Sequence, residues 1–253
     1  MAERARTAPA DFDEIHYHYE ESIDPLVQSV GGEPHDYYLQ LKANELLAHL
    51  GRLGADPSRA RALDVGCGTG RFVELLHGRL REIKGVEPSR GMLEAALRRG
   101  LPEGTFLRGH AESVPFADGA FDAVFSSCIF HHTPAASHVR MASEMARTLK
   151  PGGWLFAFEH NPLNPLTRWI VSRCAVDVGV TLHRGGRLER VFRDAGLSRV
   201  HTRYIVFFPS LLKALRPLEP FLHSVPLGGQ YYVCAQKAAQ ARFRTPFFDP
   251  GAV

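Results

Sequence analysis

The sequence predicts an α/β fold in which helices cover a mostly parallel sheet. Short apolar segments alternate with amphipathic helical stretches along the middle of the chain, which is the pattern of right-handed βαβ units. The first apolar segment runs directly into a glycine-rich turn and then a helix. A chain of 253 residues with 45% hydrophobic content is long enough to bury one full core, so we expect a single domain.

The N-terminal part is predicted to be helical after an unstructured start. Residues 1–10 show no periodicity, and we expect them to be disordered. Residues 11–24 (DFDEIHYHYEESID) are acidic and aromatic. A helix follows them, because apolar residues recur at helical spacing at Leu39, Ala43, Leu46, Leu47 and Leu50. This helix is expected to cover one face of the sheet.

The middle of the chain alternates predicted strands with predicted helices. We expect strands in the segment that ends at Asp64 and at 83–89, 121–126 and 154–158. Apolar stripes predict helices between them at 72–80, 91–97 and 135–149. The last of these helices stops at Lys-Pro-Gly-Gly, residues 150–153. Residues 154–158 are apolar without interruption, as expected of a strand that is covered on both faces.

The C-terminal part adds one helix and two closing strands. An apolar stripe at 188–195 predicts a helix that ends at Gly196, and 203–208 and 229–237 are the predicted strands. Residues 207–228, rich in proline and apolar residues, are expected to form a lid beside a substrate pocket. A membrane-surface helix is the alternative, but three prolines break its amphipathic pattern, so membrane contact is not expected. Residues 238–253 are a predicted flexible tail.

Composition and charge narrow the class of partner. The chain carries 30 basic and 27 acidic residues, a net charge of +3, without a basic block interleaved with aromatics, so nucleic acid is not an expected partner. Four scattered cysteines without CxxC spacing fit reduced thiols in the cytoplasm. No apolar run approaches the roughly 18 residues of a membrane span. We expect a cytoplasmic monomer or homodimer with a small-molecule partner.

The turn after the first strand has the pattern D-x-G-x-G-x-G, formed by Asp64, Gly66, Gly68 and Gly70. Glycines let backbone N–H groups and a helix start approach a ligand closely. A dinucleotide fingerprint needs its third glycine three places after the second, where this chain has Arg71. The second strand ends in Glu87, at the place where this architecture sets a carboxylate against ribose hydroxyls.

These segments resemble the class I S-adenosylmethionine (SAM)-dependent methyltransferases. The glycine turn resembles that family's first motif, TFLRGHAESVPFADGAFDAVFSSC its third strand, adenine-contacting turn and fourth strand, and LKPGGWLFAFEH its fifth strand. The resemblance covers residues 35–237 and is most specific over 62–161. It implies a Rossmann-like seven-stranded sheet with an antiparallel seventh strand, one domain over 11–237 and a helical lid at 11–50. It also implies SAM as the cofactor.

The resemblance also implies a set of cofactor-binding residues. They are Asp64, Gly66, Cys67, Gly68, Gly70, Glu87, Pro88, Ala111, Glu112, Ser127 and Tyr19. Glu87 would hold the ribose hydroxyls, and Ala111 and Glu112 the adenine, although His110 stands where many relatives have an acid. Cys128 would wall the methionine portion beside Ser127. Tyr19 either reaches the amino-acid end of the cofactor or packs on the lid.

Polar residues follow the predicted fourth and fifth strands, whose carboxyl ends should line the ligand site. The candidate catalytic residues there are His131, Glu159, His160 and Asn161. Imidazole titrates near neutral pH and a carboxylate beside it holds its tautomer, while Asn161 would orient the acceptor. The alternative for His131 and His132 is helix capping or packing. Neither the His-His nor the Glu-His pair has a recurrent metal-ligand spacing with a third partner, so no metal site is predicted.

The chemistry that the resemblance implies is methyl transfer to a small molecule. SAM carries its methyl group on a sulfonium, so the protein must align donor and acceptor and, for a phenol, alcohol or carbon acid, remove a proton. The lid-like segments favour a specialised metabolite, methylated on oxygen, nitrogen or carbon. Two alternatives stay open, namely a SAM-binding regulator or scaffold without turnover, and an enzyme that uses SAM for non-methylating chemistry.

Overall fold

Seven strands of the described chain form one sheet in the order β3-β2-β1-β4-β5-β7-β6. The computed structural model describes residues 11–15, 19–54 and 56–239. The strands are β1 (Arg61–Val65), β2 (Glu82–Glu87), β3 (Phe106–Arg108), β4 (Phe121–Ser127), β5 (Leu149–His160), β6 (Ser198–Ile205) and β7 (Gln230–Gln236). Among them, β7 runs antiparallel to both of its neighbours, β5 and β6, and all other pairs are parallel. The predicted seven-stranded, mostly parallel sheet is confirmed.

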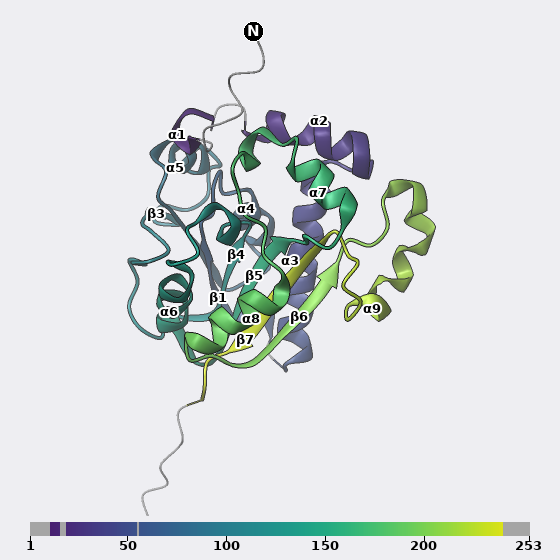
Figure 1. The fold of residues 1–253 in the computed structure, drawn as a ribbon. Helices are drawn as coiled ribbons and strands as arrows, with labels where there is room; N and C mark the ends of the chain where they lie inside the picture. Colours follow the sequence, from purple (N-terminus) through teal and green to yellow (C-terminus); the bar gives the residue numbers. More distant parts are fainter. Residues whose placement is uncertain (1–10, 16–18, 55, 240–253) are drawn as a thin grey trace, which may run out of the picture.

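Helices cover both faces of this sheet (Figure 1). The α-helices of the described chain are α1 (Phe12–Ile15), α2 (Tyr19–Gly31), α3 (His35–Arg52), α4 (Arg71–Leu76), α5 (Arg90–Leu97), α6 (His138–Thr148), α7 (Pro165–Val171), α8 (Gly185–Asp194) and α9 (Glu219–Leu222). The described residues also form four 3₁₀ helices: η2 (Pro57–Arg59), η3 (Phe130–His132), η4 (Ala175–Asp177) and η5 (Ser210–Leu218). Leu46 of α3 and Phe72 of α4 are buried on one face, and Met141 of α6 and Phe192 of α8 on the other.

The local sequence places helix starts at the edge where the strands end. Gly70 precedes α4 in the left-handed region, with φ of 76°, which glycine adopts without strain. The Ser89 hydroxyl accepts the backbone N–H of Met92 and caps α5. Asn164 caps α7 in the same way, and Pro165 occupies its first turn. Backbone N–H groups of these turns therefore lie at the carboxyl edge of the sheet.

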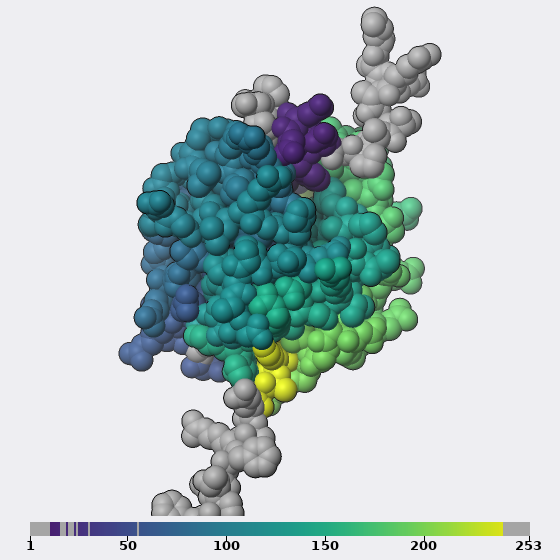
Figure 2. All heavy atoms as spheres, turned by 90° about the vertical axis from the view of Figure 1, so that its left-hand side faces the viewer, coloured from purple at the N-terminus to yellow at the C-terminus, as the bar shows by residue number. Residues whose placement is uncertain are grey.

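A cap of α1, α2, α7 and η4 covers this edge (Figure 1). Buried Ile23 of α2 packs against Cys174 and Val176 from the segment of η4. The Asp13 carboxylate accepts the N–H of Gly91 at 3.0 Å, which fixes α1 to the start of α5, and Figure 2 shows α1 in dark purple on this surface. The part of the cap between β5 and α8 was not expected from the sequence.

The segment 207–228 lies beside β6, at the edge of the sheet (Figure 1). Leu211, Phe221 and Leu227 there are 92, 81 and 61% exposed. The predicted lid at 207–228 reaches the carboxyl edge at both of its ends. Phe207 lines a cavity there, and the carbonyl of Gly228 accepts the side-chain amide of Asn161, just after β5. The predictions for 1–10 and for a tail at 238–253 fall, except for residues 238 and 239, outside the described residues. Among the described helices, none is long and apolar enough to cross a membrane.

Candidate functional site

Two adjoining cavities lie under the cap, at the carboxyl ends of β1, β2, β4 and β5. The β2-side cavity has a volume of about 430 Å³ and the β5-side cavity about 220 Å³. They share a wall made of Tyr19, Gly66, Gly68, Ser127, Cys128 and His132. Every predicted cofactor residue except Gly70 lines one of the two cavities. Residues that lie far apart in the chain and that the sequence singled out thus line the same two cavities.

The three glycines of the turn have different surroundings, although φ is positive at each: 76° at Gly66, 54° at Gly68 and 76° at Gly70. A Cβ at Gly66 would lie 2.5 Å from a methyl group of Ile129, and one at Gly70 would lie 2.6 Å from the ring of Phe106. A Cβ at Gly68 would meet no protein atom within 4 Å. Gly68 thus faces the cavities. The prediction that Gly70 contacts the cofactor is replaced by a packing role at the start of α4.

Two buried carboxylates lie at the carboxyl ends of β1 and β2. Glu87 accepts the N–H of Gly68 at 2.9 Å and that of Ser89 at 3.0 Å. Burial raises the pKa of Glu87, and these two backbone N–H groups partly offset that shift. Asp64 is 1% exposed, and one of its carboxylate oxygens has no hydrogen-bond partner. Burial and the nearby Glu87 raise the pKa of Asp64 well above its ordinary value, although Lys42 opposes that shift.

The rest of the β2-side cavity is mostly apolar. Its lining includes Phe12, Pro88, Met92, Ala111, Ile129 and Met141. Glu112 also lines it but lies 3.7 Å from a guanidinium nitrogen of Arg140. Phe12 comes from α1 and makes an edge-to-face contact with the ring of His132. The sequence offered no signal for Phe12, because its place over the cavity depends on how α1 docks on α5.

Lys42 and Cys128 bring charge to the β5-side cavity. Lys42 is only 2% exposed, donates to the Ser127 hydroxyl at 2.9 Å and lies 3.7 Å from the Cys128 sulfur. Burial raises the pKa of Cys128, but Lys42 and His160 outweigh that effect and lower it to about 6. Lys42 was missed, although it shares the buried stripe of α3 with Leu39 and Leu46, and a lysine on such a stripe is a readable signal.

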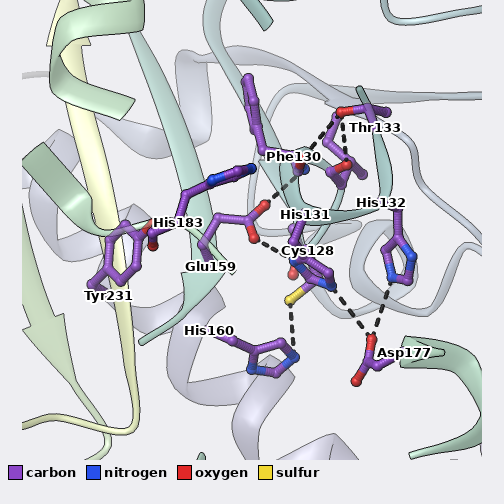
Figure 3. A network of polar contacts seen from close by, with 12 residues as sticks. Cys128, Phe130, His131, His132, Thr133, Glu159, His160, Asp177, His183 and Tyr231 are labelled. Atoms are coloured by element: carbon purple, nitrogen blue, oxygen red, sulfur yellow. Dashed lines mark hydrogen bonds and ion pairs between the residues drawn. The ribbon is translucent and has the colours of Figure 1, made fainter. Parts of the chain in front are cut away.

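A network of histidines and carboxylates closes the polar end of this cavity (Figure 3). Glu159 accepts the N–H of Phe130 at 2.9 Å and lies 2.5 Å from Nδ1 of His131. Nε2 of His131 and Nε2 of His132 each lie 3.4 Å from Oδ1 of Asp177. Burial lowers the pKa of His131, but Glu159 and Asp177 outweigh it and raise the pKa well above its ordinary value.

His160 belongs to this network through Cys128. Its Nε2 lies 3.8 Å from the Cys128 sulfur. Burial lowers the pKa of His160, and Cys128 and Asp177 more than compensate, so the net shift is upward. Asp177 was not expected from the sequence, because η4 joins no strand and carries no motif.

The four predicted catalytic residues have separate places. His160 lines the β5-side cavity, whereas His131 and Glu159 are buried behind it. Asn161 is a correction. Its amide donates to the carbonyls of Pro226 and Gly228, and its oxygen accepts the N–H of Leu163. All its polar atoms therefore hold loops, and Asn161 lines neither cavity.

The comparisons with known proteins agree with this geometry. A family model described as a methyltransferase domain matches residues 63–157. A biotin biosynthesis bifunctional protein of Cellvibrio japonicus is 32% identical over 182 residues, 70% of this chain and 32% of that protein. A phthiotriol/phenolphthiotriol dimycocerosates methyltransferase of Mycobacterium ulcerans is 31% identical over 160 residues, 61% of this chain and 56% of that protein. The chain belongs to the class I SAM-dependent methyltransferases.

Solved methyltransferase structures share the fold. A SAM-dependent methyltransferase of Thermotoga maritima, described as a possible histamine N-methyltransferase, has a TM-score of 0.63 at 23% identity and covers 89% of this chain and 98% of its own. Phosphoethanolamine N-methyltransferase 2 of Haemonchus contortus, in complex with SAM, has a TM-score of 0.59 at 20% identity and covers 90% of this chain and 60% of its own. The predicted family, fold and cofactor, SAM, are confirmed. The chain spans only 32 and 56% of the lengths of the two curated relatives.

Proposed function

We propose that this protein transfers the SAM methyl group to a small molecule that has an apolar body and one polar reacting group. The observation that carries the proposal is the shared wall of the two cavities at the ends of β1 and β4. SAM in the β2-side cavity would reach across this wall to Asp64, and an acceptor in the rest of the β5-side cavity would meet its methyl group there. Such alignment alone supplies about 7–11 kcal/mol of barrier reduction.

The residues present fit SAM. Asp64, with its unpartnered buried oxygen, would accept the ammonium of the amino-acid end, and the ammonium of Lys42 faces the same cavity. Glu87 would accept the ribose hydroxyls, and Pro88, Met92 and the backbone of Ala111 would hold the adenine in the β2-side cavity. SAM, when bound, supplies an activated methyl group on its sulfonium. Tyr19, which lines both cavities, would close the site from the cap.

The acceptor side is apolar at its walls and polar at its end. The walls come from α2, α7 and the segment of η4, and include Ile23, Val27, Leu166, Ile170, Val171 and Val176. His132, His160 and Asp177 supply polar atoms at the end. This arrangement binds a small acceptor with an apolar body and presents one oxygen, nitrogen or carbon group to polar side chains. The named relatives, one of biotin biosynthesis and one acting on phthiotriol dimycocerosates, support an acceptor of this kind.

The test combines binding with turnover in one preparation. The purified chain is titrated calorimetrically with SAM and S-adenosylhomocysteine, and release of S-adenosylhomocysteine is then followed over pooled amines, phenols, carboxylates and glycosides. Micromolar binding and acceptor-dependent release are expected. Binding without release by any acceptor would favour a SAM-binding regulator instead. An absence of binding would refute the proposal altogether.

A further inference from the structure

Three residues with metal-binding side chains come together at the polar end of the β5-side cavity (Figure 3). They arrive from η3, β5 and η4, and one ligand atom from each of His131, His160 and Asp177 lies within 4.8 Å of the other two. Imidazole nitrogens and a carboxylate oxygen are the ligands that zinc and related divalent transition metals take. The sequence prediction of no metal site depended on the missing third partner, which Asp177 provides.

We propose that His131, His160 and Asp177 bind a divalent transition metal ion, with zinc the best match to this ligand set. His132, at 3.4 Å from the same oxygen of Asp177, is available as a further donor. The proposal of a metal site depends only on the arrangement of these residues. Its role toward an acceptor, given below, rests on the proposed function.

The spacing of the donor atoms favours a metal over direct hydrogen bonds. His131 Nε2 and His132 Nε2 are each 3.4 Å from Asp177 Oδ1, longer than the roughly 2.7–3.2 Å of a good N–H···O bond. Two ligands at about 2.0–2.1 Å from a tetrahedral metal are about 3.4 Å apart. His131 Nε2 makes no hydrogen bond of ordinary geometry, although its side chain is 0% exposed. A buried nitrogen in this position lacks a partner that a metal would supply.

The contacts behind His131 are those of a metal ligand. Its other ring nitrogen, Nδ1, faces the Glu159 carboxylate, which the N–H of Phe130 holds in place. Histidines that bind metals almost always donate this second N–H to a carboxylate, carbonyl or water. When Nδ1 donates to Glu159, the lone pair lies on Nε2 and faces Asp177. Glu159 is therefore a positioning residue for His131.

The charge of the cluster also calls for a cation. Glu159 and Asp177 are 1 and 9% exposed, and burying two carboxylates without compensating charge is costly. A dication bound at the cluster would offset both of these charges.

The position of the cluster points to a role with the acceptor. His160 and Asp177 line the cavity, so a metal held by them would be approachable from the acceptor side. Three protein ligands with an open position are the arrangement of catalytic zinc sites, whereas structural sites are closed by four. The acceptor class would then be a molecule with a hydroxyl, carboxylate or thiol group that ligates the metal and is thereby oriented.

A second cluster in the described chain serves as an internal control. His49, His201 and Cys234 also offer ligand atoms within 4.8 Å of one another. Their donors already face each other or a neighbour, since the Cys234 sulfur lies 3.0 Å from Nε2 of His201 and His49 Nδ1 lies 3.4 Å from the Tyr232 hydroxyl. None of the three lines the described cavities. If only substitutions in this second cluster abolished metal binding, the proposal would be contradicted.

The experiment measures metal binding without turnover. The full chain is stripped with a chelator, then titrated with Zn²⁺ against a chromophoric competitor and with Co²⁺ by absorption spectroscopy. The variants are His131→Gln, Asp177→Asn and Glu159→Gln, with His201→Gln and Cys234→Ser as matched controls. Calorimetric titration with SAM shows that each variant keeps its fold.

One equivalent of Zn²⁺ is expected to bind to the wild type. The affinity for Zn²⁺ should fall roughly 100-fold or more in His131→Gln and Asp177→Asn, and about 10–100-fold in Glu159→Gln. The two controls should retain wild-type affinity. The proposal is overturned if the wild type binds no metal, or if metal is lost only in the controls. Metal-free protein that binds SAM and methylates an acceptor would refute the role of the metal toward the acceptor and leave the proposed function intact.

Discussion

Replacing Gly68 by alanine separates backbone strain from ligand contact. With φ of 54°, an alanine at this position adopts the left-handed region at a cost of about 1–2 kcal/mol. The new methyl group meets no protein atom within 4 Å, so packing adds nothing to that cost. For a chain of this size, we expect the melting temperature to fall by roughly 2–8 °C. The methyl group would occupy space over the shared wall of the cavities, and we expect SAM affinity to fall at least about tenfold, about 1.4 kcal/mol.

Gly78→Ala is the matched control for this change. Gly78 has φ of 77° and equally open surroundings, but it lies after α4 and lines neither cavity. It should lose a similar amount of stability and keep wild-type SAM affinity. Thermal unfolding followed by calorimetric titration measures both quantities. Equal SAM affinities in the two variants would show that Gly68 does not face the cofactor, and the assignment of the shared wall would fail.

Three further predictions concern a ligand, a loop and a titration. Glu87→Ala removes an acceptor of charge-assisted hydrogen bonds, each about 1.5–3 kcal/mol, and should weaken SAM binding at least about tenfold by calorimetry; Glu82→Ala, at the other end of β2, should not, and a change within twofold in Glu87→Ala would contradict its role. Asn161→Ala removes three hydrogen bonds to loops. It should lower the free energy of unfolding by about 2–4 kcal/mol and leave kcat unchanged below the melting range, and Asn44→Ala, at an exposed position, should change neither quantity. A large loss of kcat alone would restore a role for Asn161 in turnover. Burial, followed by Arg203 and Arg52, lowers the pKa of His223 from 6.5 to about 4, while Glu45 lies 3.9 Å from it. As the pH falls, His223 of the unfolded chain takes up a proton before His223 of the folded chain does. The contribution of His223 to the free energy of unfolding should therefore be fully present above about pH 6.5 and decrease toward pH 4. His223→Gln should reduce this pH dependence in denaturant titrations, and an unchanged pH dependence would show that another group is responsible.

Much of the cofactor side was predictable because its signals are local. A turn with three glycines between an apolar strand and a helix needs positive φ, and all three glycines have it. Glu87 ends a strand that pairs in parallel with β1, so its place beside the turn follows from the order of the elements. Ala111, Ser127 and Pro88 follow strand ends or turns in the same way, and each lines a cavity.

The acceptor side was predictable only in part. His160 follows β5 directly and lines the cavity as expected, but Asn161, one residue later, turns to the loops before β7. The two differ because the backbone leaves the strand there, which sequence spacing does not show. The cap was expected from its N-terminal helices, while α7 and η4 and the cavity wall that they build were not.

The sequence by itself determined the order of strands and helices, the glycine turn and the carboxylate that lies against it, because period and turn chemistry act between near neighbours in the chain. Only the tertiary structure decided which distant groups meet. Lys42 reaches Ser127 because α3 packs on the sheet face. Asp177 reaches His131 and His132 because η4 packs against α2 in the cap. Such contacts depend on the docking of whole elements, whose energy is spread over many apolar side chains and leaves no motif at the residues that it brings together.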